Sequence, residues 1–155
     1  MSTVLKNYIV NREHHQFRKG FEEYANLADT YKELGLCPKE RMARRFELLA
    51  SLETPVLLPD EKICFLRTVK EIPDCFTEDE WVEIKSKHFI HELGYISNLS
   101  PNYERVIANG LLAERENADV YGQRIIDAII ALTDRYKELA LAEGKEELAA
   151  ILERV

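Results

Sequence analysis

The stretch that most constrains the fold begins after Asn117 and runs to about Glu143. Its apolar side chains recur at three- and four-residue steps, which places them along one stripe of an α-helix. These positions are Val120, Tyr121, Ile125, Ile126, Ala128, Ile129, Ile130, Leu132, Tyr136, Leu139 and Ala140. A stripe this wide is buried on more than one side. We therefore predict a long central helix, and we expect part of its apolar surface to need a partner beyond this chain of 155 residues.

Helical periodicity also covers most of the remaining sequence. We predict helices over residues 8–35, over 38 to about 53, over 77 to about 91, and over 145–155. Thr54-Pro55 interrupts this pattern, and a short extended arm is expected around residues 56–69. Long helices with short connections predict an all-α fold, mainly a helical bundle, in a single domain that spans residues 1–155.

The second predicted helix has an apolar face and a basic face. The apolar positions, which we expect to be buried, are Met42, Phe46, Leu49 and Ala50. The basic positions are Arg41, Arg44 and Arg45. Because Glu40 and Glu47 lie beside these arginines, we expect a solvated, ion-paired face rather than a phosphate site.

The helix predicted from residue 77 starts with a capping box, Thr77-Glu78-Asp79-Glu80. In this motif the threonine side chain caps the helix, and the glutamate reaches back three residues. Trp81 follows directly, and we expect this large side chain to be a core anchor rather than a platform for a ligand.

Charge and cysteine content exclude several function classes. The formal net charge is −7, which disfavours nucleic acid and anionic membrane surfaces as partners. No apolar run reaches the ~18 residues of a transmembrane helix, and the N-terminus lacks the apolar run of a signal peptide. The three cysteines form an odd and sparse set, so we expect reduced thiols and a cytoplasmic location.

Cysteines and histidines in the middle of the chain do not have the spacing of a metal site. His88 and His91 share one face of a predicted helix, and Cys64 and Cys75 precede them. The Cys-x10-Cys spacing is not that of a zinc finger or knuckle, and no H-E-x-x-H motif is present. No phosphate-binding loop or nucleophile–base pair appears either. The sequence therefore predicts no metal site, no cofactor and no catalytic residue within this chain.

The stretch that precedes the central helix contains both a helix start and a helix stop. The Ser100 hydroxyl can cap a helix, and Pro101 fits the first helical position, where no backbone N–H is needed. Val106 and Ile107 supply an apolar face, and Gly110 offers a left-handed stop. The pattern predicts a short helix that is entered from an irregular loop.

This stretch resembles the N-terminal part of the glycyl radical enzymes, the family of formate C-acetyltransferase and glycerol dehydratase. Members have a loop ending in Pro-Asp/Asn-Tyr/Trp and then a helix of the form E-x-V-L-x-x-G-L. The matching residues here are Pro101, Asn102, Tyr103, Glu104, Val106, Ile107, Gly110 and Leu111. Residues 121–140 are similar to the family's long helix ending in A-x-R-Y-A-x-L-A. The resemblance covers roughly residues 40–155, although residues 59–65 lack a glycine that the family carries.

The resemblance implies that this chain is the N-terminal helical scaffold of a pyruvate formate-lyase-like enzyme, an anaerobic lyase or acyltransferase of a small metabolite. Full-length members carry a glycyl radical, which an iron–sulfur activase installs with S-adenosylmethionine. The implied partners are the remainder of the enzyme chain, this radical-activating enzyme and a second copy in a homodimer. The family's radical glycine and thiyl cysteine have no counterpart here, so we expect the chain to be inactive by itself.

The resemblance also offers one candidate for a substrate pocket. Some dehydratase-type relatives place a Gly-His pair three residues before the loop proline, and the equivalent positions here are Ser97 and Asn98. Asn98 is therefore the candidate pocket residue. The alternative is that Asn98 satisfies backbone groups of its own loop, as asparagine readily does.

A free-standing helical interaction module is the alternative interpretation of the whole chain. Such a module docks on a full-length enzyme or self-associates through the wide apolar face of residues 120–141. The sequence stops at Val155 without a cap, a glycine or a polar tail, which favours the N-terminal fragment of a much longer enzyme.

Overall fold

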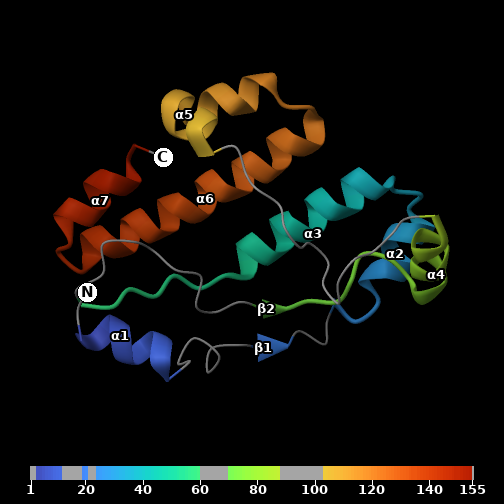
Figure 1. Ribbon diagram of the computed structural model, residues 1–155, viewed down its shortest axis with the longest axis horizontal. Helices are drawn as coiled ribbons and strands as arrows, with labels where there is room; N and C mark the ends of the chain where they lie inside the picture. Colours follow the sequence, from blue (N-terminus) through green and yellow to red (C-terminus); the bar gives the residue numbers. More distant parts are fainter. Residues whose placement is uncertain (1–2, 12–18, 21–23, 60–69, 88–102, 155) are drawn as a thin grey trace.

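The computed structural model describes residues 3–11, 19–20, 24–59, 70–87 and 103–154 (Figure 1). The helices in these ranges are α1 (Thr3–Val10), α2 (Leu27–Glu33), α3 (Pro38–Leu52), α4 (Glu78–Lys87), α5 (Tyr103–Asn117), α6 (Val120–Ala142) and α7 (Glu146–Leu152). Two short strands, β1 (Lys19–Gly20) and β2 (Lys70–Glu71), pair in parallel. The fold is all-α, as the sequence predicts, and the strand pair is a small addition to it.

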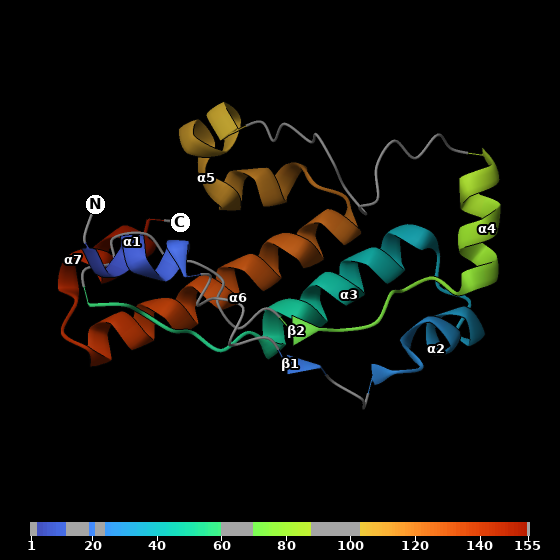
Figure 2. The same ribbon diagram turned by 60° about the horizontal axis from the view of Figure 1, so that its bottom comes forward.

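The helices α3 and α6 lie side by side and form the spine of the molecule (Figures 1 and 2). At the start of both helices, the Cys37 thiol donates to the Tyr121 hydroxyl at 3.3 Å. At the end of α3, the Arg135 guanidinium donates to the carbonyls of Ser51 at 3.2 Å and Glu53 at 2.7 Å. Because these contacts occur in the same order along both helices, α3 and α6 run parallel.

The bounds of α6 follow from signals at its two ends. The Asp119 carboxylate accepts the Gly122 N–H at 2.8 Å, which caps the first turn. After the last turn, Gly144 adopts a φ of +69°, a conformation that glycine takes without steric cost. The span agrees with the long central helix that the sequence predicts. None of the described helices is both long enough and apolar enough to cross a membrane.

The first hydrophobic core, the α6–α7 core, lies between α6, α7 and the extended segment after α3. Its buried residues are Leu57, Tyr136, Ala140, Leu148 and Ala149, with Leu132, Leu139 and Leu152 packed against them. Lys145, in the turn between α6 and α7, donates to the Leu58 carbonyl at 2.8 Å and so holds the extended segment in place. The arm predicted around residues 56–69 is thus non-helical as far as residue 59, and the rest of it lies outside the described residues.

The second core is smaller and lies at the opposite end of the molecule, where α2 and α4 are found (Figures 1 and 2). Its buried residues are Leu27, Tyr31 and Cys75, with Leu36, Leu48 and Phe76 packed against them. Cys75 belongs to residues 72–87, an irregular stretch followed by α4, which we call the strap. We call this second cluster the strap core.

The prediction of a single helix over residues 8–35 is wrong. The chain instead forms two separate helices, since α1 ends at Val10 and α2 begins at Leu27. Between them, Lys19–Gly20 pairs with β2, and a local periodicity cannot reveal a partner so distant in the sequence. The predicted end of this range at residue 35 is confirmed, because Gly35 has a φ of +65°, which stops a helix.

The apolar face predicted for α3 is buried at Ala50, near the end of the helix, but not at Met42, near its start. Met42 is 51% exposed, whereas Arg41 is 7% exposed. The expected solvated arginine face is therefore wrong for Arg41, although Arg44 does donate to Glu40 one turn away, at 2.9 Å. Arg41 can be buried because the strap supplies a carboxylate that neutralises its charge.

Candidate functional site

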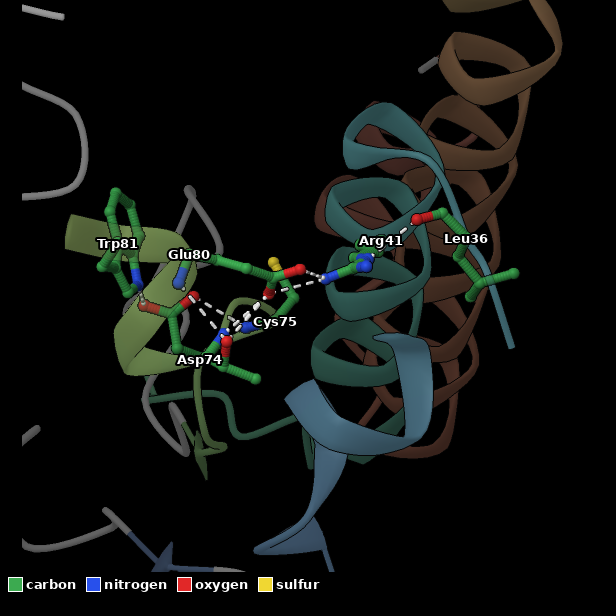
Figure 3. A network of polar contacts seen from close by, with 7 residues as sticks. Leu36, Arg41, Asp74, Cys75, Glu80 and Trp81 are labelled. Carbon is green, nitrogen blue, oxygen red and sulfur yellow. Dashed lines mark hydrogen bonds and ion pairs between the residues drawn. The ribbon is translucent and has the colours of Figure 1, made fainter. Parts of the chain in front are cut away.

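An ion pair with little solvent exposure joins α3 to the strap (Figure 3). The Arg41 Nη1 donates to both carboxylate oxygens of Glu80, each at 2.9 Å. Its Nε donates to the Leu36 carbonyl at 2.8 Å, and its guanidinium lies 5.7 Å from the centre of the Phe76 ring. The two charged side chains are 8% and 23% exposed. Solvent and salt therefore screen this pair much less than a surface ion pair.

Glu80 also caps the helix in which it lies. Its carboxylate accepts the Thr77 N–H at 2.9 Å and the Thr77 hydroxyl at 3.3 Å, and the Glu80 N–H donates back to that hydroxyl at 3.4 Å. These contacts confirm the predicted capping box. Desolvation acts to raise the pKa of Glu80, but hydrogen bonds from Thr77 and Arg41 outweigh it and hold the pKa below its usual value. Glu80 is therefore ionised near neutral pH.

A second set of contacts joins the two parts of the strap to each other. The Trp81 indole N–H donates to one oxygen of Asp74 at 2.7 Å, and the other oxygen accepts the Cys75 N–H at 2.7 Å. Phe76 packs edge-on against Trp81, with ring centroids 5.6 Å apart. The prediction of Trp81 as a core anchor is wrong, because α4 buries none of its ten side chains and Trp81 is half-buried.

Arg45 holds the first residues of the strap. Its Nε donates to the Pro73 carbonyl at 2.9 Å, and its Nη2 donates to the Ile72 carbonyl at 3.2 Å. Arg41 and Arg45 are one helical turn apart on α3, so the same side of that helix binds both the start of the strap and α4.

The two described cysteines differ in acidity. Burial raises the pKa of the Cys75 thiol to about 11, so it stays protonated near neutral pH. Cys37 is exposed at the start of α3. There the Tyr121 hydroxyl, which can donate to the ionised sulfur, and next the backbone N–H groups of Glu40 and Lys39 lower the pKa of the Cys37 thiol. Cys37 is therefore the more reactive of these two thiols.

α5 presents an apolar face to solvent. The helix is interrupted at Gly110, whose φ of 79° and ψ of 163° are not helical, and all residues from 103 to 109 are exposed. Tyr103, Val106 and Ile107 follow helical spacing along one side of this first half. Tyr103 and Ile107 are 66% and 82% exposed. The apolar face is thus available for contact with another surface.

Ion pairs hold both halves of α5 in place. Arg105, before the interruption, donates to Glu114 after it at 2.8 Å, and Asn109 donates to the same carboxylate oxygen at 3.3 Å. Arg115 donates to both carboxylate oxygens of Asp127 on α6, at 2.5 and 2.9 Å. The exposed face therefore belongs to a helix that is fixed to the spine.

The predicted pocket residue, Asn98, lies outside the described residues. The same holds for the predicted helix start and for most of the rejected metal site, which involve Ser100, Pro101, Cys64, His88 and His91. Gly110 does have the positive φ that was predicted, but the chain resumes a helix directly after it and continues to Asn117. Within the ranges that the structure describes, no three His, Cys, Asp or Glu side chains gather where they could hold a metal ion.

Two long-range contacts near the start of α3 could not be identified from the sequence. The capping box identified Glu80, but its second partner, Arg41, lies 39 residues away. The partner of Cys37 is Tyr121, which is 84 residues away. A signal for the first contact was present, since three arginines beside two glutamates leave one arginine without a local partner.

Comparisons with known proteins do not add to these observations. No model of a known protein family matches the chain, and neither the search of curated proteins nor the search of solved structures found a match.

Proposed function

We propose that this chain is a non-catalytic helical scaffold, the N-terminal segment of a glycyl radical enzyme of the pyruvate formate-lyase-like type. The exposed face of α5 is the observation that carries this proposal. Tyr103, Val106 and Ile107 belong to the motif that resembles the family, and the same side chains lie on the solvent side of α5. Contiguous exposed apolar side chains mark interaction sites. The remainder of the enzyme chain is the proposed occupant of this face.

The described polar groups fit a scaffold better than a catalytic centre. Hydrogen bonds from Arg115 lower the pKa of Asp127, and the contacts of Glu80 likewise leave its pKa below the usual value. A general acid or base works best with a pKa near the operating pH, and both carboxylates are shifted away from it. Under this proposal the glycyl radical, its activase and the substrate belong with the remainder of the enzyme.

A free-standing interaction module is the second candidate, and the exposure of α6 favours it. The face of residues 120–141 was expected to be buried on more than one side, yet α6 buries only Tyr136 and Ala140. Val120 is 65% exposed, and the isoleucines between residues 125 and 130 are half-buried. A second copy of the chain packed over the isoleucines would bury them further and form a homodimer.

The mass of the native protein distinguishes the two candidates. An antibody raised against this chain is applied to extracts of the source cells grown without oxygen. A scaffold segment predicts a polypeptide several-fold heavier than 18.0 kDa, which should give the electron paramagnetic resonance signal of a glycyl radical once activated. A polypeptide of 18.0 kDa contradicts the scaffold proposal and leaves the interaction module.

Sedimentation of the purified chain then tests whether a second copy, rather than the remainder of the enzyme, occupies the face of α5. Ile107→Asp places a charge in the apolar face of α5, and Ala108→Asp places the same charge on another side of the same turn, which is also exposed. If a second copy binds α5, the Ala108 variant stays dimeric and the Ile107 variant becomes monomeric. If the wild type and both variants are monomeric and equally folded, self-association through this face is excluded.

A further inference from the structure

We infer that the strap, residues 72–87, opens and closes on α2 and α3 as one unit, and that the Arg41–Glu80 ion pair holds it closed. In the closed state, which the structure shows, Cys75 is 3% exposed and packs with Tyr31. In the open state the Cys75 thiol and the apolar side of α2 become accessible. This inference does not depend on which of the two proposed functions is correct.

The strap has enough internal contacts to move as a unit. Asp74 joins the irregular stretch to α4 through Trp81, and Phe76 packs against the same indole ring. The capping box between Thr77 and Glu80 closes the first turn of α4 without help from other elements. All of these contacts lie within the strap, so they are retained when it separates from α3.

The apolar attachment of the strap to the rest of the molecule is small. α4 contributes no buried side chain, and the buried residues of the strap are Ile72 and Cys75, both in the irregular stretch. The α6–α7 core, by comparison, has five buried residues. Segments with few buried apolar contacts open at a lower free energy than the core. The strap should therefore open well before the whole chain unfolds.

The polar attachment of α4 to α3 includes one ion pair of low solvent exposure. Arg41 and Glu80 are both largely shielded from solvent, so removing one partner leaves the other charge poorly solvated and unpaired. Arg45 binds backbone carbonyls at the beginning of the strap, whereas Arg41 binds α4 itself. A change at this single pair should therefore shift the balance between closed and open states.

Alkylation of Cys75 measures the opening directly. The full chain is treated with iodoacetamide, and peptide mass spectrometry reads the rate at Cys75 separately from that at Cys37, which is exposed and serves as the internal reference. We expect Arg41→Met to raise the Cys75 rate by about tenfold or more, as loss of a shielded partner implies, with the Cys37 rate unchanged. Glu80→Gln should act in the same direction while it retains the capping box.

Two control variants separate local opening from general destabilisation. Arg44→Met removes an ion pair with Glu40 that lies within α3, and it should leave the Cys75 rate within about twofold of wild type. Leu148→Ala weakens the α6–α7 core and should also leave that rate nearly unchanged in buffer. A Cys75 rate that rises in Leu148→Ala as much as in Arg41→Met would overturn the inference, because opening would then be global unfolding. Unchanged rates in both Arg41→Met and Glu80→Gln would overturn it as well.

Discussion

At the α6–α7 end of the molecule, five buried residues from three segments form a core of apolar side chains. At the strap end, three buried residues lie beside the shielded charge of Arg41 and its partner Glu80. Apolar burial is non-directional and grows with the area removed from water. An ion pair of low exposure instead depends on both partners being present in the right geometry. The α6–α7 core should therefore lose stability in proportion to the apolar atoms removed from it, whereas the strap end should depend on whether both partners of one ion pair are present.

The largest effect is expected from truncation of the α6–α7 core. Leu148 is 4% exposed, and Leu148→Ala should lower the free energy of unfolding by about 3 kcal/mol, because apolar contacts are lost and a cavity remains. Urea denaturation followed by circular dichroism measures this change. Leu141→Ala removes the same atoms at a position that is 54% exposed, and it should cost less than about 1 kcal/mol. Equal losses in the two variants would show that this core is not the main source of stability.

Hydrogen bonds from Arg135, at the α6–α7 end of the molecule, test whether directional contacts also matter beside an apolar core. Arg135 of α6 donates to the carbonyls of Ala50, Ser51 and Glu53, which lie in and just after the last turn of α3. Arg135→Ala should cost about 2 kcal/mol, since hydrogen bonds to a charged group are worth more than neutral ones.

The matched control for this change is Arg124→Ala. Arg124 also reaches from α6 to α3, but its pair with Glu47 is 34% and 48% exposed, so we expect a loss below about 1 kcal/mol. Urea denaturation of both variants gives the comparison. If the two losses are equal, the carbonyl contacts of Arg135 add nothing beyond a surface ion pair.

The pH dependence of stability should separate the strap end from the α6–α7 core. The pKa of Glu80 is lower in the folded protein than its usual value of 4.5. Its contribution to stability is therefore present above that value and is lost as the pH falls through the lower folded-state pKa. The difference in unfolding free energy between wild type and Glu80→Gln should shrink as the pH is lowered from about 6 to about 3. A difference that stays constant with pH would show that the Glu80 charge is not responsible.

The smallest effect on stability is expected on the exposed face of α5. Ile107 is 82% exposed, so Ile107→Asp should change the free energy of unfolding by no more than about 0.5 kcal/mol. Thermal unfolding of the monomeric protein measures it. Ile126→Asp and Ile129→Asp, at half-buried positions of α6, should both cost clearly more, because a carboxylate there loses part of its hydration. A large loss in Ile107→Asp would mean that this side chain is covered in solution.

Local signals in the sequence determined the all-α fold and many of the helix ends. Pro38 starts α3, Thr77 and Glu80 close the first turn of α4, and the glycines at 35 and 144 end α2 and α6 with positive φ. Each signal acts between residues at most four positions apart, so it operates whatever the rest of the chain does. The apolar residues that predict α6 recur at three- and four-residue steps, so this signal is local as well. The candidate pocket residue Asn98 stays a prediction.

Tertiary structure decided which faces and which partners those helices use. Arg41 is buried because Glu80, 39 residues later, supplies a countercharge, and the apolar Met42 beside it is left exposed. Lys19 and Gly20 lie within a predicted helix but instead pair with β2. Such choices depend on groups that meet only after the chain has folded, so no local pattern contains them. The sequence by itself therefore specified most of the helices, and the contacts between distant residues specified the strap, the spine and the exposed face of α5.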